Sequence, residues 1–239
     1  TTGASNSAVG SGALAANTTA SNNTSVGYNS LNANTTGYLN TAVGALALDA
    51  NITGVANTAV GYNALSAATG DGATAVGKDA LELNTSGVNT AVGSNALATV
   101  TTGTFNVAMG NDALTLNTGS SNTAVGYGSL AANTTASENT AVGYNSLLSN
   151  TTGDGNTAIG VKAMDANTVG DRNVAVGSDA LGAMNPASNV DMYNTAVGYA
   201  AGLTLTTGTN NTLIGGLAGD AITTGSRNTV AGISALGAN

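Results

Sequence analysis

Residues that could carry out chemistry are few in this chain, and its composition excludes most kinds of catalytic site. The 239 residues include no His and no Cys, so Ser/His/Asp and Cys/His arrangements and the usual zinc sites cannot be built. The 12 acidic residues are scattered and share no repeated position. A carboxylate pair of the glycosidase type would have to come from distant segments. We therefore predict that the chain is not an enzyme and that it has no catalytic residues, no cofactor and no metal site.

Calcium is the metal that best suits a chain without His and Cys, because it takes oxygen ligands alone. Asp71-Gly72, Asp154-Gly155 and Asp171 occupy sequences typical of turns. The Gly-Gly-x-Gly-x-Asp nonapeptide of calcium-binding β-rolls is absent. We interpret these carboxylates as solvated turn residues.

Two recurring side chains could bind a ligand. Five tyrosines follow a recurring glycine directly: Tyr28, Tyr62, Tyr127, Tyr144 and Tyr199. Such a row could stack against sugars, or it could cover an edge of the structure with its hydroxyls in water. A column of asparagines could likewise form a receptor surface, or it could be an internal amide ladder that satisfies turn backbone groups. We favour the structural interpretation for both.

The elements that position these residues follow from an internal repeat. The pentapeptide Asn-Thr-Ala-Val-Gly recurs with variations along the whole chain, and 13 of its 14 copies begin with Asn. Successive copies are 16 or 17 residues apart, except for one interval of 21 residues. The final glycines of the copies are Gly10, Gly27, Gly44, Gly61, Gly77, Gly93, Gly110, Gly126, Gly143, Gly160, Gly177, Gly198, Gly215 and Gly232.

Each repeat also has a second half. A Leu or Met stands four residues after the glycine in most copies, and a turn of the type Asn-Thr-Thr-Gly follows. The stretch between them, Tyr-Asn-Ala-Leu in its fullest form, could be a helical turn or a second short strand. Two copies illustrate the repeated structural positions: Asn57, Val60, Gly61 and Leu65, and Asn122, Val125, Gly126 and Leu130.

The repeat length predicts the fold. Thr-Ala-Val is typical of a short strand that the glycine ends. About 17 residues are too few for a βαβ unit, which needs about 30, and they match one coil of a solenoid. We predict an all-β parallel β-solenoid (β-roll) of about 14 coils, forming a single domain over residues 1–239. Residues 178–197 should form a longer repeat with a surface loop around Met184-Asn185-Pro186 and Asp191, and 198–239 should be atypical terminal repeats.

The positions of the charged residues suggest that the solenoid packs against other chains. All 16 of them lie outside the pentapeptides. Because a strand alternates its faces, a face in water should have acquired some charge among so many copies. We therefore expect one strand face to point into the coil and the other to pack against neighbouring chains. A homotrimer is the natural assembly for a fibre.

Bulk properties narrow the list of partners. A net charge of −8 disfavours nucleic acid and anionic membranes. No run of 18 apolar residues is present, so we expect no membrane insertion within this segment. The chain starts without Met and without a signal peptide, which we take to indicate a fragment or a processed piece.

The pentapeptide resembles a motif of known fibres. Asn57 to Gly61, and more closely Asn156-Thr157-Ala158-Ile159-Gly160, is similar to the Ser/Asn-x-Val-Ala-Ile-Gly motif of trimeric autotransporter adhesin heads. The longer unit looks like repeats in phage tail fibres and bacterial surface proteins. The resemblance covers essentially the whole chain, and it implies a trimeric, left-handed parallel β-roll. The period here is longer, and Thr stands where the adhesins usually have Val.

The resemblance and the absence of catalytic residues together predict a function. We expect a structural or adhesive fibre segment, from a phage tail fibre or a bacterial surface adhesin, that spaces or presents a site for binding a host or surface. The expected location is extracellular, on a cell surface or a virion, with a cell-surface glycan or protein as a further partner. The alternative is an ice-binding β-solenoid, because Thr41, Thr58, Thr74, Thr90 and Thr123 form one column and Thr36, Thr53, Thr69 and Thr102 approximate a second.

Overall fold

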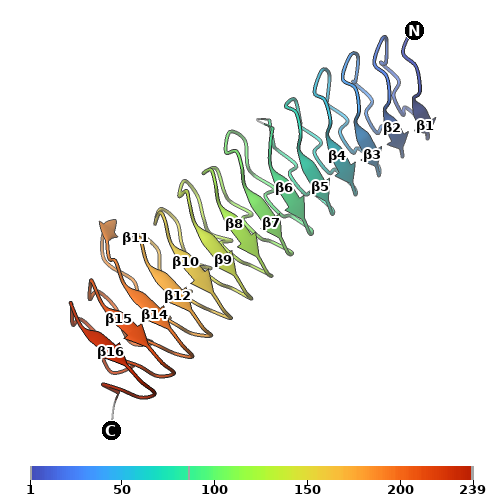
Figure 1. Cartoon of the computed structure of the whole chain (residues 1–239). Coiled ribbons are helices and arrows are strands. Elements are labelled where there is room, and N and C mark those ends of the chain that lie inside the picture. Colours follow the sequence, from blue (N-terminus) through green and yellow to red (C-terminus); the bar gives the residue numbers. More distant parts are fainter. Residues whose placement is uncertain (1, 86, 238–239) are drawn as a thin grey trace. The chain divides into compact units, whose positions relative to one another are not determined.

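A computed structural model describes residues 2–85 and 87–237 of the chain. These residues divide into two compact units, unit 1 (Thr1–Thr118) and unit 2 (Gly119–Asn239). Each unit consists of short parallel strands joined by turns, with repeats about 17 residues apart (Figure 1). The chain is an all-β parallel β-solenoid of about 13 turns, which confirms the predicted fold class and repeat length.

The strands of unit 1 pair side by side without any stagger between repeats. Thr41, for example, lies opposite Thr58, and Val43 lies opposite Val60. The same matching of equivalent positions holds for every pair in the unit. The strands are β1 (Ser7–Val9), β2 (Thr24–Val26), β3 (Thr41–Val43), β4 (Thr58–Val60), β5 (Thr74–Val76), β6 (Thr90–Val92) and β7 (Val107–Met109).

Unit 2 repeats this arrangement and adds a small second sheet. Its main strands also pair in register and in parallel. They are β8 (Thr123–Val125), β9 (Thr140–Val142), β10 (Thr157–Ile159), β12 (Val174–Val176), β14 (Thr195–Val197), β15 (Thr212–Ile214) and β16 (Thr229–Ala231). The second sheet pairs β11 (Gly170–Asp171) with β13 (Val190–Asp191).

Small apolar side chains fill the inside of each coil. The central residue of the strand, such as Ala59, and the Leu four residues beyond the glycine, such as Leu65, are both buried inside the coil with 0% exposure. Burial of a Leu in this way contributes about 2 kcal/mol relative to leaving it in water. The equivalent buried residues are Leu31, Leu48, Leu81, Leu97, Leu114, Leu130, Leu147, Met164 and Leu181.

The stretch after the glycine is neither the helical turn nor the second strand that the sequence left open. Asn63 and Leu65 have φ angles of 59° and 53°, which lie in the left-handed region, and the same two positions are left-handed in most coils. A left-handed non-Gly residue costs about 1–2 kcal/mol. The Leu65 N–H donates to the Ala80 carbonyl of the next coil at 3.0 Å while its side chain is fully buried, and these contacts offset the strain.

The 21-residue repeat is longer because of a segment at 187–191 that lies exposed on the surface. Met184, shortly before this segment, and Met192, directly after it, are fully buried. Val190–Asp191 does not hang free, because it forms β13 and pairs with β11 of the preceding coil. Residues Met184 and Pro186, which the sequence placed in the loop, are buried in the coil wall.

Candidate functional site: the outward strand face

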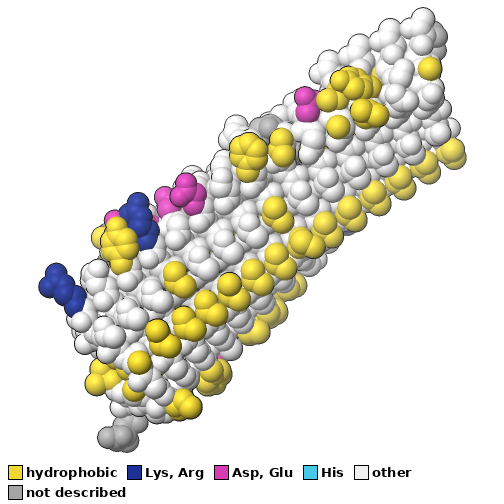
Figure 2. All heavy atoms as spheres, in the orientation of Figure 1, with side chains coloured by type: hydrophobic (Ala, Val, Ile, Leu, Met, Phe, Trp, Pro, Cys, Tyr) yellow, Lys and Arg dark blue, Asp and Glu magenta, His cyan; other side chains and the backbone are white. Residues whose placement is uncertain are grey.

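In each unit the outward side chains of the main strands form an extended, uniform surface. We call this surface the strand face; it consists of the first and third residues of the main strands. Thr58 is half-buried and Val60 is 36% exposed, while Ala59 between them points inward. Figure 2 shows the hydrophobic members of this surface as a row along the strands. The exposed apolar residues of the row are Val9, Val26, Val43, Val60, Val76 and Met109 in unit 1, and Val174, Ile159, Val197 and Ile214 in unit 2.

No charged residue belongs to the strand face. Its repeated composition is one hydroxyl and one branched apolar side chain per strand, placed directly beside the same pair on the next strand. Val125 and its neighbour Val142 follow the same pattern in unit 2, where both are half-buried. The chain by itself therefore covers one face of each sheet and leaves the other open. An open apolar row of this kind is typical of an interaction surface.

The tyrosines lie one residue beyond the glycine, directly after the strands. Tyr28, Tyr62, Tyr127, Tyr144 and Tyr199 are all at least half exposed. Tyr127 and Tyr144 stack on each other, with ring centroids 5.6 Å apart and 14° between the planes. Each of these two rings covers one face of the other, so only the outer faces of the pair are open to a stacking ligand.

The asparagine column is buried, and it links the coils. The Asn57 backbone N–H donates to Asn40 Oδ1 at 2.9 Å, and the Asn57 amide donates to the Gly70 carbonyl at 2.9 Å. Asn122 takes the same position in unit 2, where its oxygen accepts from the Asn139 N–H at 3.0 Å. Asn57 and Asn122 have 0% exposure. Of the two alternatives for the asparagine column, a receptor surface and an internal amide ladder, the buried side chains fit the ladder.

A second buried asparagine column runs through the turns and is interrupted. Asn51 donates to Asn34 Oδ1 at 2.9 Å and to the Gly54 carbonyl at 3.1 Å. The next position in the column is Ala68, which has no amide to donate in return. Asn51 Oδ1 is buried and has no hydrogen-bond partner. An acceptor left in this state costs about 1–3 kcal/mol.

We expect Ala68→Asn to stabilise the protein. Its amide would reach Asn51 Oδ1 as Asn51 reaches Asn34, and the free energy of unfolding should rise by about 1 kcal/mol. Urea denaturation measures the change. The matched control is Ala67→Asn, one residue earlier and half-buried, which lies outside the column and should give no gain. A loss of stability in the Ala68 variant would contradict the ladder interpretation.

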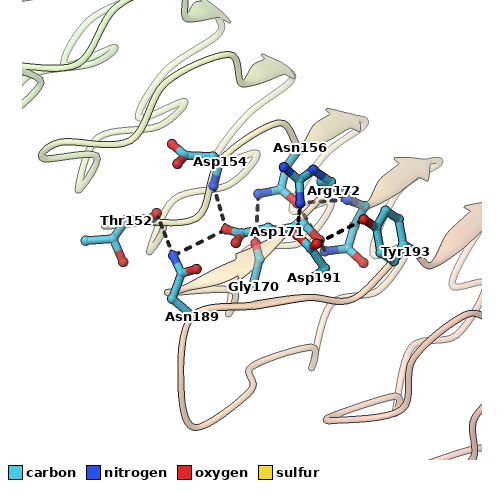
Figure 3. Close-up of polar contacts among 10 residues, drawn as sticks. Thr152, Asp154, Asn156, Gly170, Asp171, Arg172, Asn189, Asp191 and Tyr193 are labelled. Atoms are coloured by element: carbon cyan, nitrogen blue, oxygen red, sulfur yellow. Dashed lines mark hydrogen bonds and ion pairs between the residues drawn. The ribbon is translucent and has the colours of Figure 1, made fainter.

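The longer repeat places a group of charged residues beside the second sheet (Figure 3). Asp171 Oδ1 accepts from the Asp154 N–H at 2.8 Å and from the Asn189 amide at 3.4 Å. Arg172 forms an ion pair with Asp191, whose other oxygen accepts from the Tyr193 hydroxyl at 2.9 Å. Burial raises the pKa of Asp171, and the charges of Asp154 and Asp191 add to this, whereas the Asp154 N–H opposes it. These contacts tie the loop to the preceding coils.

Residues 2–85 and 87–237 contain no cluster of three or more potential metal ligands and no pocket. In the same residues there is no helix that is long and apolar enough to cross a membrane. Asp71 and Asp154 are exposed and link their turns to the preceding coil: Asp71 Oδ1 accepts from the Val55 N–H at 2.8 Å, and Asp154 Oδ1 accepts from the Ser137 N–H at 2.6 Å.

Comparisons with protein-family models, with curated proteins and with solved structures find no match to this chain. The β-solenoid fold and the geometry of its surfaces are therefore the basis for a functional assignment.

Proposed function

We propose that the chain is a structural, adhesive fibre segment that self-associates through its strand face as a homotrimer. The observation that carries this proposal is the open row of outward side chains, mostly Thr and Val, which has no charge and continues along the main strands. Apolar rows of this length are covered in most soluble proteins, and a second and third copy of the same chain present the same row. The resemblance of the pentapeptide to adhesin heads supports the three-fold arrangement.

The role of such a segment is mechanical. Rigid stacked coils hold a distal site away from the surface to which the fibre is attached, and three identical chains raise the avidity of that site. We propose that the protein acts outside the cell, on a phage tail fibre or a bacterial surface, with a host-surface glycan or protein as the partner of the fibre. The exposed tyrosines next to the strand face are the side chains best suited to a lateral contact with such a partner.

Sedimentation equilibrium tests the assembly. We expect a particle of three times the chain mass of 22.7 kDa, and we expect Val43→Lys with Val60→Lys to give monomers, because two lysines per chain would have to be buried in the interface. The matched control is Thr36→Lys with Thr53→Lys, two exposed turn residues in neighbouring coils, which should leave the trimer intact. A wild-type protein that is folded and strictly monomeric would refute the trimer.

A second candidate function uses the same surface. Threonines lie beside threonines on neighbouring strands, as at Thr58 and Thr74, and valines lie beside valines in the same register. Such an array could bind ice if it faces water. The second threonine column, which includes Thr36 and Thr53, lies in exposed turns and does not belong to the strand face. Thermal hysteresis separates the two functions. A monomer with clear activity, lost in the Val43→Lys and Val60→Lys variant, would favour ice binding over the fibre.

A further inference from the structure

One methionine of the chain lies on the strand face, and the other three are buried. Met109 is the third residue of β7 and is 46% exposed. The other methionines have 0% exposure; they are Met164, Met184 and Met192. Met109 pairs in register with Val92 of β6, so it occupies the position that valine takes in the other strands of unit 1. Its thioether is therefore the side chain of this row in unit 1 that a mild oxidant can modify.

The strand that carries Met109 lacks the hydroxyl that its neighbours carry. Strands β1 to β6 each begin with Ser or Thr, whereas β7 begins with Val107. Val107 lies on the same outward face as Met109, because the two residues are two positions apart on one strand. Val92 lies beside Met109 on β6. A polar atom added to Met109 would therefore have hydrocarbon side chains on these two sides and no hydroxyl on its own strand.

Oxidation of Met109 follows the ordinary chemistry of a thioether. Hydrogen peroxide transfers one oxygen atom to Sδ, so that an S–O bond forms, the O–O bond breaks and water leaves. The sulfur loses two electrons and the peroxide gains them. The product is a polar side chain that accepts hydrogen bonds and donates none. Met109 is open to this attack in the folded single chain, and burial protects the other three methionines.

We propose that Met109 is an oxidation site through which a peroxide controls the lateral assembly of the chain. This inference rests on the proposed self-association through the strand face. In a homotrimer whose axis runs along the stack of coils in unit 1, three-fold symmetry brings equivalent strands to one level, so that β7 faces β7 of the other copies. The side chains of β7 are Val107, Ala108 and Met109, and none of them donates a hydrogen bond.

The sulfoxide should therefore act against the assembled state and not against the fold. In the trimer its oxygen would be buried beside the equivalent apolar strands, and a buried acceptor without a partner is destabilising. In the single chain the same oxygen would be solvated, since Met109 is exposed there. A chain that is oxidised before it assembles should stay folded and monomeric.

Sedimentation equilibrium of the 239-residue protein, before and after treatment with hydrogen peroxide over a dilution series, tests the site. Peptide mass spectrometry should place the added oxygen at Met109 and find the three buried methionines unmodified. The association constant of the trimer should fall by about 100-fold or more, because each assembly would bury three unpartnered acceptors. Circular dichroism should stay unchanged. Methionine sulfoxide reductases should restore the trimer, because this oxidation is reversible.

Two variants isolate the position of the methionine. Met109→Leu keeps an apolar side chain on the strand face, and its trimer should withstand the same treatment. Met109→Leu with Val88→Met moves the exposed methionine off the strand face, to a position in unit 1 that is 52% exposed. Oxidation of this second variant should leave its trimer intact.

The outcomes separate this inference from the proposed assembly. Untreated protein that is folded and monomeric would refute the trimer itself. A trimer that persists with Met109 fully converted to the sulfoxide would overturn the oxidation site alone and would leave the strand face as the interface. The site would also be overturned by a Met109 that resists peroxide in the diluted, dissociated protein. Equal loss of the trimer when the methionine is at position 88 would contradict it as well.

Discussion

Gly61→Ala is expected to lower the free energy of unfolding by about 3–5 kcal/mol. Gly61 has φ near 141°, a backbone conformation that L side chains rarely adopt. A Cβ built on it would lie 2.3 Å from the carbonyl oxygen of Gly77 in the next coil, and 2.6 Å from the carbonyl carbon. Both neighbours are backbone atoms, so no side-chain rotation can make room.

The effect should be local as well as large. The described strands of unit 1 contact only the adjacent strands, so displacement of the Gly77 carbonyl disturbs the pairing of β4 with β5 before it reaches other strands. Urea denaturation measures the loss of stability, and hydrogen exchange should show the fastest opening in these two strands. Backbone N–H groups in the distant coils of unit 1 should keep more of their protection.

The matched control is Gly216→Ala in unit 2. A Cβ at Gly216 meets no atom within 4 Å, and its φ lies outside the left-handed range, so the change should be close to neutral. Equal stability of the Gly61 and Gly216 variants would contradict the close approach of the coils at the recurring glycine.

Asn57→Asp should be nearly as damaging at neutral pH, with an expected loss of about 3–4 kcal/mol. The buried amide of Asn57 donates to the Gly70 carbonyl, and its oxygen accepts from the Ala73 N–H at 2.9 Å. A carboxylate keeps the second bond and cannot make the first. It also places a charge at a position with 0% exposure, and no Lys or Arg is among the buried residues that the structure describes.

The pH dependence of this variant gives a second signature. Burial should raise the pKa of the new carboxyl above its ordinary value in the folded protein. The folded state then binds the proton more tightly than the unfolded state. The penalty is therefore complete above the raised pKa and shrinks as pH falls toward the ordinary pKa of an aspartic acid. Relative to wild type, the variant should gain stability on acidification.

Asn22→Asp is the control for charge alone. Asn22 is exposed, and its φ of 60° is one that Asp also tolerates. This variant should lose less than about 0.5 kcal/mol and should show little extra dependence on pH. A loss as large as that of the Asn57 variant would mean that charge, and not the buried ladder, is responsible.

The repeat in the sequence was enough to predict the parallel solenoid, the short Thr-Ala-Val strand and the buried Leu column. It could not predict the backbone between them. Leucine in a left-handed conformation is rare in proteins, so local propensity argues against the geometry that Leu65 adopts. The conformation is imposed by stacking on the neighbouring coils, and stacking between coils is absent from any single repeat.

The sequence likewise predicted the composition of the strand face but not the small second sheet. The absence of charge in the pentapeptide indicated a face that avoids water, and the structure places Thr58 and Val60 on an open face of that composition. The pairing of Val190–Asp191 with Gly170–Asp171 had no signal in the sequence, because two residues form each strand and neither has a strand pattern. The hydrogen-bond partners of each buried amide also could not be predicted, because they depend on which coils lie before and after it.

The interrupted asparagine column has a consequence for folding. Coils that are nearly identical can pair as well with the second neighbour as with the first, leaving about 17 residues looped out, and loop closure alone discourages this only weakly. Apolar residues stand where other coils have the turn asparagine at Ala68, Val100, Met184, Leu205 and Ile222. A skipped coil would place a buried amide opposite one of these residues without a partner, as already occurs at Asn51. The irregular coils thus make the correct order of stacking more stable than an order in which a coil is skipped.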